Sequence, residues 1–404
     1  MRIRYLLLNA YARGGTVRTI LSMANLLAER GHDVEVASLV QHRLEPRYPV
    51  SPAVRLVSLT GTRPRLSRPG TADNAVRWAG ELTLRGTRSR LAHPRDRRCA
   101  DLTLAHDHQL RHYVQAQDDC VVVATRLTLD LALAGLRTDR QVAVAQEHNH
   151  LSQHPDVRQE YAAHYPALDA VTVLTEGDAI AYRSLLDDAC PVVVVPNAMP
   201  HGTVLRRSPL TAPVAVAAGS LVHRKGFDLL IDAWRTVAVT HPGWRLRIYG
   251  EGELRHDLAE RIERAGLSAV VSLEGFQPDL ARCLDEASLF VLPSRAEGLP
   301  MVVIEAMAAG LPVVAADCPT GPAELLEHGR HGVLVRPRDS AALADGILRV
   351  VSDAVEQRRL ADAAASRARS FDLTATAARW EGVLEALADD RGLSVGRPQA
   401  RHHV

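Results

Sequence analysis

The stretch RIRYLLLNAYARGGTVRTILSMANLLAERGHDVEVASLV, residues 2–40, decides the fold of this chain. It opens with an apolar run, passes through a glycine turn and enters a segment whose apolar residues recur at i, i+3, i+4 and i+7, the spacing of a helix with one buried face. The residues at that spacing are Ile20, Met23, Ala24 and Leu27. Gly31 follows at the C′ position, where glycine adopts the left-handed backbone at little cost. With the apolar run DVEVASLV directly after it, the stretch predicts a βαβ unit and a parallel sheet with a right-handed crossover.

The same alternation continues through most of the chain. Further strands are expected in the first half at 54–59, 120–125, 140–148, 169–175 and 190–197. After a loose polar stretch at 201–212, a second series begins at VAVAAGS and includes helices at about 226–238 and 253–265. This rhythm predicts an α/β protein of two Rossmann-like parallel-sheet domains. The expected divisions are an N-terminal domain 1–200, a C-terminal domain 201–372, a helix 373–390 and a polar tail 391–404.

Composition and charge exclude several classes of protein. The 404 residues carry 48 basic and 47 acidic side chains, a formal charge of +1, so no overall field favours nucleic acid. No apolar run approaches the ~20 residues of a membrane-spanning helix, and the N-terminal apolar run is too short for a signal peptide. The five cysteines include no CxxC pair, which disfavours a disulfide framework or a zinc site. The expected location is the cytoplasm.

An arginine-rich segment, RGTRSRLAHPRDRR, occupies residues 85–98. We interpret it as a solvated surface loop, because turn-forming residues are interspersed among the arginines. The alternative is electrostatic contact with anionic lipid headgroups, which would place the protein peripherally on the inner face of the membrane.

The strongest chemical signal is SLFVLPSRAEGLPMVVIEAMAAGLPVVAAD, residues 288–317. A buried strand is expected to end at Pro293. Pro300 is expected to open a helix at its N1 position, where the missing N–H is tolerated. The first-turn amides of that helix lack partners within the helix, and the helix dipole adds to their preference for an anion. The segment therefore predicts a strand–loop–helix anion site.

Two glutamates flank this expected anion site. Glu297 lies in the loop, and Glu305 follows Pro300 by five residues, about 7–8 Å along the helix axis at 1.5 Å per residue. A carboxylate at Glu305 can accept hydrogen bonds from a neutral diol such as a ribose, and Glu297 would lie nearer to whatever is attached beyond the phosphates. Taken singly, each glutamate is more simply a loop residue or a surface helix residue. Together they favour a nucleotide-linked ligand.

Lys225 is the only lysine among the 48 basic side chains. A solitary lysine in so arginine-rich a chain indicates a position where the planar guanidinium will not serve. Chance is the alternative interpretation of a single residue.

The E-x(7)-E spacing of Glu297 and Glu305 within EGLPMVVIEAMAAGLPVV resembles the signature of retaining glycosyltransferases of family 4, which have the two-domain GT-B fold. The resemblance covers most of the chain. The further segments that carry it are GGTVRTILSMANLLAERGHDVEV (14–36), PNAMP (196–200), AAGSLVHRKGFDLLIDAW (217–234), YGEGELR (249–255) and LEGFQPDL (273–280). QEHNHL (146–151) and DCPTGPAELL (317–326) are similar to members that build cell-surface polysaccharides.

The resemblance implies a GT-B fold whose domains face each other across a cleft, with the helix 373–390 packing back on the N-terminal domain. It implies transfer of a sugar from a nucleotide-diphosphate donor, a UDP- or GDP-sugar, to a hydroxyl acceptor (a glycan, a lipid-linked glycan or a small molecule) with retention at the anomeric carbon. The donor is a co-substrate, so no cofactor is expected. The chain has no D-x-D pattern and no HExxH spacing, so no metal site is expected.

The resemblance also implies roles for single residues. Lys225 would bind the donor diphosphate, Glu297 the transferred sugar and Glu305 the ribose. The expected catalytic residues are Glu297, His148 and Lys225. The expected donor-binding residues are Gly14, Gly15, Arg224, Lys225, Gly275, Phe276, Glu297, Gly298, Leu299, Pro300 and Glu305. Glu147, beside His148, fits either a base-and-orienter pair or a structural salt bridge.

The chain departs from the family at one position. Where the family has G-R-L, this chain has Gly219, Ser220 and Leu221, and Arg224 is the candidate to replace the missing arginine. If nothing replaces it, the chain would be a catalytically weak or inactive nucleotide-sugar binding protein of the same fold. A GT-B sugar phosphorylase or epimerase is a further alternative.

Overall fold

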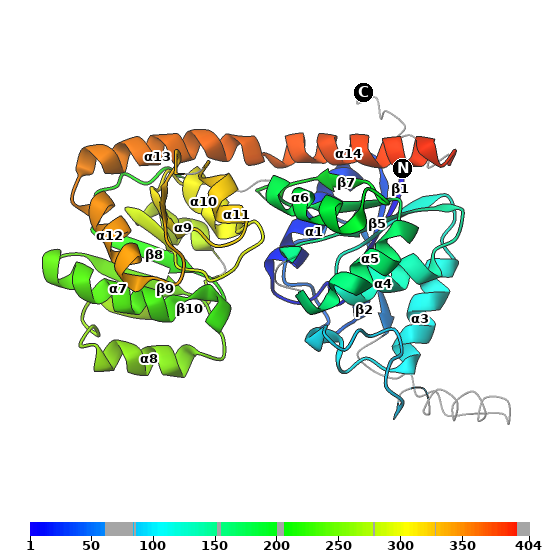
Figure 1. Cartoon of the computed structure of the whole chain (residues 1–404), viewed down its shortest axis with the longest axis horizontal. Coiled ribbons are helices and arrows are strands. Elements are labelled where there is room, and N and C mark those ends of the chain that lie inside the picture. The colour runs from blue at the N-terminus through cyan, green and yellow to red at the C-terminus, as the bar shows by residue number, and fades with distance from the viewer. Residues whose placement is uncertain are drawn as a thin grey trace. The chain divides into compact units, whose positions relative to one another are not determined.

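The computed structural model describes residues 1–60, 84, 86–151, 155–199, 206–277, 279–327 and 329–393. They form two compact units, one of Met1–Val195 with Thr376–Val404 and the other of Pro196–Ala375 (Figure 1). Most of the expected tail at 391–404, part of the expected linker at 201–212, and Arg85 lie outside the described residues.

The first unit is built on a seven-stranded parallel sheet in the order β3-β2-β1-β4-β5-β6-β7. Its strands are β1 (Arg2–Leu7), β2 (Asp33–Val40), β3 (Arg55–Thr60), β4 (Cys120–Ala124), β5 (Gln141–Gln146), β6 (Ala170–Val173) and β7 (Val192–Val194). Its helices are α1 (Gly15–Glu29), α3 (Leu104–Gln115), α4 (Leu127–Leu136), α5 (Arg158–His164) and α6 (Glu176–Leu186), with 3-10 turns η1 (Arg97–Cys99), η3 (Pro155–Val157) and η4 (Tyr165–Ala167).

The predicted βαβ opening is confirmed as β1, α1 and β2. The helix residues at the predicted spacing are buried, and Ile20 and Leu27 are fully so. Gly31 follows the helix with φ +91°, the left-handed conformation expected of a C′ glycine. The central strands β4 and β5 are buried along their whole length, as strands of a parallel sheet covered on both faces are.

The second unit is built on a six-stranded parallel sheet in the order β10-β9-β8-β11-β12-β13. Its strands are β8 (Val214–Ala218), β9 (Arg245–Tyr249), β10 (Val271–Gly275), β11 (Leu289–Leu292), β12 (Val313–Ala316) and β13 (Val333–Val335). Its helices are α7 (Phe227–Thr240), α8 (Arg255–Arg264), α9 (Leu280–Asp285), α10 (Met301–Ala308), α11 (Gly321–Leu325), α12 (Ser340–Val351) and α13 (Ala354–Ala368), with turns η5 (His223–Lys225) and η6 (Arg369–Phe371). Helix α7 packs against α12, and α10 packs against α13.

The last helix, α14 (Leu373–Asp390), belongs to the first unit from Thr376 onward. Trp380 is fully buried, and its indole N–H donates to the hydroxyl of Tyr5 on β1 over 2.8 Å. A buried indole N–H needs such an acceptor, so this hydrogen bond ties the C-terminal helix to the first strand of the chain.

When the strands of each sheet are numbered in chain order, both sheets have the spatial order 3-2-1-4-5-6. The first sheet has a seventh strand, β7, beside its sixth. This is the Rossmann order, and it confirms the expected pair of parallel-sheet α/β domains. In such sheets ligands bind beyond the carboxyl ends of the strands where the order reverses. That point lies between β1 and β4 in the first unit and between β8 and β11 in the second. None of the helices within the described ranges is both long and apolar enough to cross a lipid bilayer.

Candidate active site

Arg224, Lys225 and Glu297, three of the residues expected to bind a donor, gather at the reversal point of the second sheet. One loop leaves β8 and reaches Gly226, and the other leaves β11 and reaches Pro300. Because β8 and β11 are parallel neighbours, both loops emerge at the same edge of the sheet. Segments 72 residues apart in sequence therefore meet, as the hydrogen bond between Lys225 and Glu297 shows.

Glycines let the backbones of these loops touch. A Cβ atom on Gly250 would lie 1.8 Å from the carbonyl oxygen of Gly219, and one on Gly252 would lie 2.4 Å from that of Leu221. The loops are also joined by backbone hydrogen bonds from Gly219 to Tyr249 and from Leu221 to Glu251, both 2.9 Å. The loop after β9 thus supports the loop after β8. This close packing accounts for Gly250 and Gly252 in the β9 loop.

Lys225 lies at the end of the short turn η5, directly before Gly226. Its side-chain carbons pass within van der Waals reach of Gly219, where an added Cβ would be 3.4 Å from Lys225 Cε. Gly226 has φ +68°, and a Cβ there would lie 2.1 Å from the carbonyl oxygen of Pro293. The turn is therefore pressed against the loop that follows β11, and only glycine fits at Gly226.

Lys225 and Glu297 form a close ion pair. Lys225 Nζ lies 2.6 Å from Glu297 Oε1, and the two side chains are 14% and 5% exposed. Ser294 Oγ donates to the same carboxylate oxygen over 2.6 Å. An ammonium has three N–H donors, so Lys225 can keep this bond and still donate to a ligand oxygen. The pair places a cation and a hydrogen-bonded carboxylate side by side at the loop edge.

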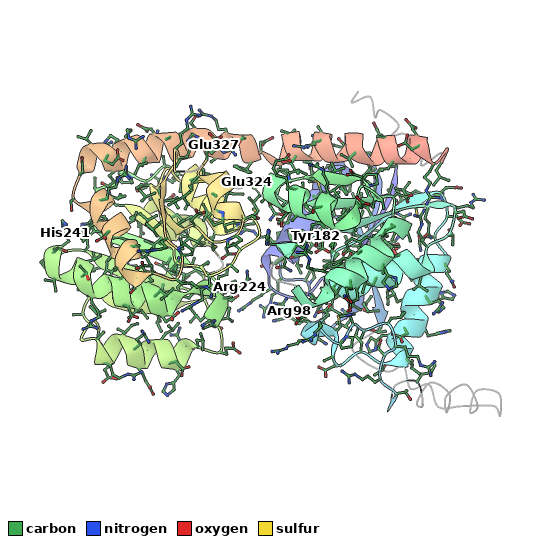
Figure 2. The ribbon with its side chains drawn as sticks, viewed as in Figure 1. Arg98, Tyr182, Arg224, His241, Glu324 and Glu327 are labelled. Atoms are coloured by element: carbon green, nitrogen blue, oxygen red, sulfur yellow. The ribbon has the colours of Figure 1, made fainter. Side chains whose placement is uncertain are left out.

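Arg224 converges on the same carboxylate from the neighbouring position. Its Nη1 lies 3.5 Å from Glu297 Oε2 and donates to the carbonyl oxygen of Ala296 over 3.1 Å. The guanidinium is 41% exposed, and Figure 2 labels it on the second unit. Adjacent loop residues usually point in different directions, but here both basic side chains reach Glu297. Ser220, which occupies the family's arginine position, is exposed.

The structure corrects the expected position of Pro300. The sequence predicts Pro300 at N1, but its ψ of 105° is extended, and it is the N-cap of α10, whose first residue is Met301. The amide of Val303 donates to the Pro300 carbonyl over 3.0 Å. Amides at the first positions of a helix have no acceptor within it, so the amides expected to bind an anion begin at Met301.

Both glutamates of the signature are buried. Glu305 is 4% exposed on α10, and Glu297 is 4% exposed in the loop. The interpretation of Glu305 as an ordinary surface helix residue is therefore wrong, because a buried carboxylate is retained only with compensating partners.

The loop between the glutamates is held from two sides. A Cβ on Gly321, at the start of α11, would lie 1.9 Å from the carbonyl oxygen of Gly298. Asn197 Nδ2 donates to the carbonyl oxygen of Leu299 over 3.2 Å, and the side chain of Leu299 is buried. The segments around Asn197 and Gly321 therefore fix the backbone expected to hold the sugar.

Gly275 ends β10, and Phe276 follows it at the same edge of the sheet. The carbonyl of Gly275 accepts from the amide of Gly250 over 2.8 Å, which joins this loop to the others. Gly275 has φ +76°, a conformation that favours glycine. Phe276 is a large apolar residue with 40% exposure, and such a ring offers a face on which a base can stack.

Gly14 and Gly15 lie in the first unit, at the start of α1 after β1. No described atom comes within 4 Å of a Cβ built on either residue, so the backbone there faces open space. Gly14 has φ +149°, and its amide donates to the hydroxyl of Tyr48 over 3.2 Å. The amides of this turn begin the helix at the reversal point of the first sheet.

His148 lies two residues beyond β5 of the first unit. Burial lowers the pKa of His148 to about 4, and its Nε2 has no hydrogen-bond partner within the part of the chain that the structure describes. The imidazole is therefore neutral at pH 7. It can form hydrogen bonds, but it carries no extra proton to donate as a general acid.

Glu147 belongs to a buried cluster of acids and tyrosines. Its carboxylate accepts from the hydroxyl of Tyr165, which also lies 3.5 Å from Asp130 Oδ2. The rings of Tyr161, Tyr165 and Tyr182 pack together, and Figure 2 labels Tyr182 on α6. Burial is the main cause that raises the pKa of Glu147 to about 7 and that of Asp130 well above its usual range. Among the described residues, the hydrogen-bond partner of the Glu147 carboxylate is the hydroxyl of Tyr165.

Two features of the site were missed by the sequence analysis. Ser294 is fully buried against Glu297, and it lies in the quoted segment as an unremarked serine. Arg295 forms a two-pronged ion pair with Asp228, with Nη1–Oδ1 2.8 Å and Nη2–Oδ2 2.6 Å. Residues 67 positions apart give no local signal of such a pair.

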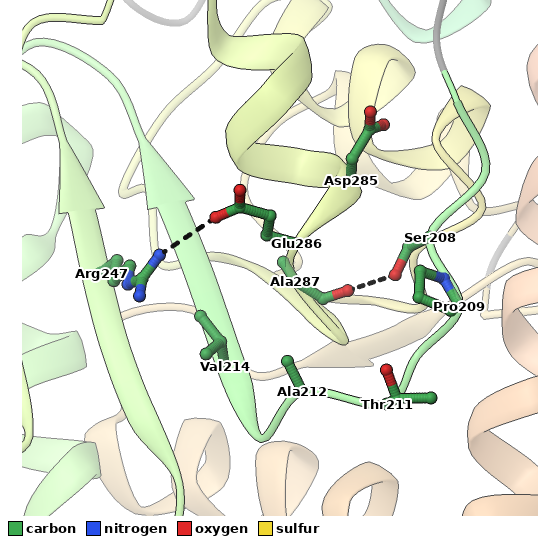
Figure 3. A pocket seen from close by; sticks show the side chains of 9 residues that line it. All are labelled: Ser208, Pro209, Thr211, Ala212, Val214, Arg247, Asp285, Glu286 and Ala287. Carbon is green, nitrogen blue, oxygen red and sulfur yellow. Dashed lines mark hydrogen bonds and ion pairs between the residues drawn. The ribbon is translucent and has the colours of Figure 1, made fainter.

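A pocket elsewhere in the second unit does not compete with this site. It has a volume of about 390 Å³ and is lined by Val214, Arg247 and residues Asp285–Ala287 among others (Figure 3). Val214 begins β8, so the pocket lies at the edge where the strands start, away from the loops that follow β8 and β11. No group of three or more His, Cys, Asp or Glu side chains within the described residues is arranged to hold a metal ion.

Two Rossmann-type units with parallel sheets in this order define the class: the chain has a GT-B fold. Residues 212–353, which contain β8 to α12 and the whole Lys225–Glu297 site, match the family model described as glycosyl transferases group 1. This match lies within the second unit.

Curated relatives cover both units. The chain is 32% identical over 397 residues to an exopolysaccharide phosphotransferase of Streptomyces coelicolor, a match that covers 97% of this chain but only 41% of that protein. It is 24% identical over 391 residues to an uncharacterized glycosyltransferase of Haemophilus influenzae, covering 95% of this chain and 99% of the relative. The chain thus spans less than half of the first relative and nearly all of the second.

Solved structures share the fold at low identity. TarM of S. aureus, solved as a mutant with UDP, fondaparinux and α-GlcNAc-glycerol, has a TM-score of 0.75 and 14% identity, covering 95% of this chain and 99% of TarM. HepE of Anabaena, solved with UDP and glucose, has a TM-score of 0.71 and 20% identity, covering 96% of this chain and all of HepE.

Proposed function

We propose that this chain transfers a sugar from a nucleotide-diphosphate donor to a hydroxyl acceptor with retention at the anomeric carbon. The observation that carries the proposal is the convergence of Lys225, Arg224 and Glu297 beside the first turn of α10, at the reversal point of the sheet. This arrangement offers two cations and free helix amides to a diphosphate, and a carboxylate to the sugar next to it.

In the proposed reaction the acceptor oxygen bonds to the anomeric carbon while the bond from that carbon to the diphosphate oxygen breaks. The hydroxyl proton passes to the departing phosphate oxygen, so no protein nucleophile and no metal ion are needed. Lys225, Arg224 and the amides at the start of α10 would stabilise the negative charge that develops on the leaving diphosphate. Glu305 would accept from the ribose, and Phe276 would stack on the base.

The same proposal assigns Gly14 and Gly15 to the diphosphate and His148 to the sugar. Open space at the glycines and a neutral, half-buried imidazole support these roles. The solved structures of TarM and HepE, which hold UDP, favour a UDP-sugar as donor, and the names of the relatives favour a cell-surface glycan as acceptor. Poly(ribitol-phosphate) α-N-acetylglucosaminyltransferase of S. aureus, 34% identical over 135 residues, and an amylovoran biosynthesis glycosyltransferase of Erwinia amylovora, 28% over 169, are among them.

The test is a panel of UDP- and GDP-sugars, with binding followed by thermal shift and turnover by release of the nucleotide with and without glycan acceptors. We expect one donor to stabilise the protein and to be consumed when an acceptor is present, and Glu305→Ala to lose that stabilisation. Tight binding with no turnover would favour an inactive sugar-nucleotide binder. Turnover that requires inorganic phosphate would identify a phosphorylase.

A further inference from the structure

Asp228 and Arg295 form a two-pronged ion pair outside the proposed donor ligands. The guanidinium of Arg295 presents two N–H groups to the two carboxylate oxygens of Asp228, at 2.8 and 2.6 Å. Two-pronged pairs of this kind are directional and stronger than neutral hydrogen bonds. Arg295 is 13% exposed and Asp228 28%, so solvent screens this pair less than a typical surface ion pair.

The pair connects the two loops that carry the proposed ligands. Arg295 stands two residues before Glu297, and Asp228 stands three residues after Lys225, in the first turn of α7. Arg295 Nη1 also donates to the carbonyl oxygen of His223 over 2.8 Å, and its backbone amide donates to that of Arg224 over 2.8 Å. One residue therefore bonds to the turn η5 and to the helix that follows it.

The charge state of Asp228 favours its ion pair with Arg295. Burial acts to raise the pKa of Asp228, but the hydrogen bonds and charge of Arg295 outweigh burial and lower it below its usual range. Backbone amides at the start of α7 act in the same direction, as expected for a carboxylate in a first helical turn. The pair is therefore ionised throughout the neutral range.

We propose that Asp228 and Arg295 are positioning residues that hold the ammonium of Lys225 against the carboxylate of Glu297. The proposal rests on the proposed function, because that spacing matters only if a diphosphate and its sugar span the two groups. Neither residue touches the donor. Their effect is to fix the distance between a phosphate ligand and a sugar ligand on separate loops, and misplacement of about 1 Å can reduce turnover by up to about 100-fold.

A matched control lies one turn further along the same helix. Asp232 on α7 accepts from Arg261 on α8, with Arg261 Nε 2.9 Å from Asp232 Oδ1. This pair has the same chemistry but joins two helices and neither of the site loops. Asp232→Asn therefore removes an ion pair of the same kind without removing any hydrogen bond between Asp228 and Arg295.

The first experiment needs no substrate. Lys225 is the only lysine of the chain, so an amine-reactive reagent labels a single side chain, which mass spectrometry separates from the N-terminal amine. The side chain of Lys225 is only 14% exposed and is held by Glu297, so labelling of the parent should be slow. We expect Asp228→Asn and Arg295→Met to label at least threefold faster than the parent, and Asp232→Asn to match the parent.

The second experiment measures donor turnover in the same proteins. We expect kcat to fall about tenfold or more in Asp228→Asn and in Arg295→Met, with the double variant no worse than the poorer single variant, because both changes remove one interaction. The Kd for UDP alone should change less than about threefold. A merely structural role would lower thermal stability without this split between kcat and nucleotide affinity.

The outcomes separate the two proposals. Unchanged labelling of Lys225 in Asp228→Asn and Arg295→Met would overturn the positioning role whether or not the parent is active. Faster labelling in an active parent whose variants keep full kcat would overturn it as well. A parent that neither binds nor consumes any sugar nucleotide refutes the proposed function, and the labelling rates then still decide whether the brace exists.

Discussion

Gly226 and Pro293 approach so closely that a Cβ atom on Gly226 would lie 2.1 Å from the carbonyl oxygen of Pro293. This contact joins the end of the Lys225 turn to the start of the loop that carries Glu297. No side chain on Gly226 fits without moving one of the two loops. The backbone contact and the ion pair of Lys225 with Glu297 are thus two consequences of the same close approach.

The substitution Gly226→Ala should therefore destabilise the protein far more than the backbone angle alone would predict. Gly266 is a matched control, because its φ of +69° equals the +68° of Gly226, yet nothing lies within 4 Å of its Cβ position among the described residues. We expect Gly266→Ala to lower the free energy of unfolding by about 1–2 kcal/mol, and Gly226→Ala by about 3 kcal/mol or more. Urea unfolding of both variants measures this difference, and equal losses would contradict the steric argument.

Lys225→Ala should weaken binding of the donor because it removes a charge-assisted hydrogen bond to the diphosphate. Such a bond contributes about 1.5–3 kcal/mol, so we expect Kd to rise by roughly 10- to 100-fold. Lys225→Arg should restore little of this, because a broad planar guanidinium does not reproduce the compact ammonium that contacts Glu297. Isothermal titration with the donor found in the panel measures both, with the exposed Arg235→Ala as control. Parent-like affinity in Lys225→Ala would place the diphosphate elsewhere.

Much of the fold could be predicted from the sequence because each unit repeats a simple pattern. Alternating apolar runs and amphipathic helices specify parallel sheets covered on both faces, and glycines mark where the chain turns. The meeting of Lys225 and Glu297 follows from the same logic, since both come directly after strands that are neighbours in a Rossmann order. Local sequence and general topology were sufficient for this part of the site.

Other features depend on tertiary contacts that no local pattern encodes. The brace between Asp228 and Arg295 joins residues on a helix and a loop far apart in the chain. The extended ψ of Pro300 arises where the loop meets α10. The helix start predicted from the proline is therefore one residue too early. The acid–tyrosine cluster around Glu147 was missed because its tyrosines lie on α6, α5 and the adjoining turn η4 and meet Glu147 only after folding.

Stability of the first unit should fall as pH rises, because Glu147 has a raised pKa in the folded state. Below about pH 4.5 both the folded and the unfolded chain hold this proton. Between 4.5 and about 7 only the folded chain holds it, so unfolding releases a proton and becomes easier as pH rises. Above about pH 7 the decrease in the free energy of unfolding is complete, and it is on the order of 3 kcal/mol.

The substitution Glu147→Gln tests this sign. Glutamine keeps the size and stays neutral, so the variant should lose less thermal stability between pH 5 and pH 8 than the parent does. Asp130→Asn should act in the same direction, because burial and the charge of Glu147 raise the pKa of Asp130 as well. Glu45→Gln, which changes an exposed carboxylate of the same unit, should leave the slope unchanged. A slope in Glu147→Gln identical to that of the parent would show that the proton resides elsewhere.

His148 should remain neutral throughout the pH range in which the enzyme is assayed. Burial lowers its pKa to about 4, so lowering the pH from 8 to 6 changes its charge very little. If His148 donates or accepts a hydrogen bond to the sugar, His148→Ala should reduce kcat/KM by roughly 10-fold, while the shape of the pH profile between 6 and 8 stays that of the parent. The ring carbon resonance of His148, assigned by its loss in His148→Asn, should not titrate in NMR spectra above pH 5. An inflection near pH 6.5 in the parent that disappears in His148→Ala would instead make His148 a proton-transfer group, and the metal-free reaction drawn above would then need a protein base.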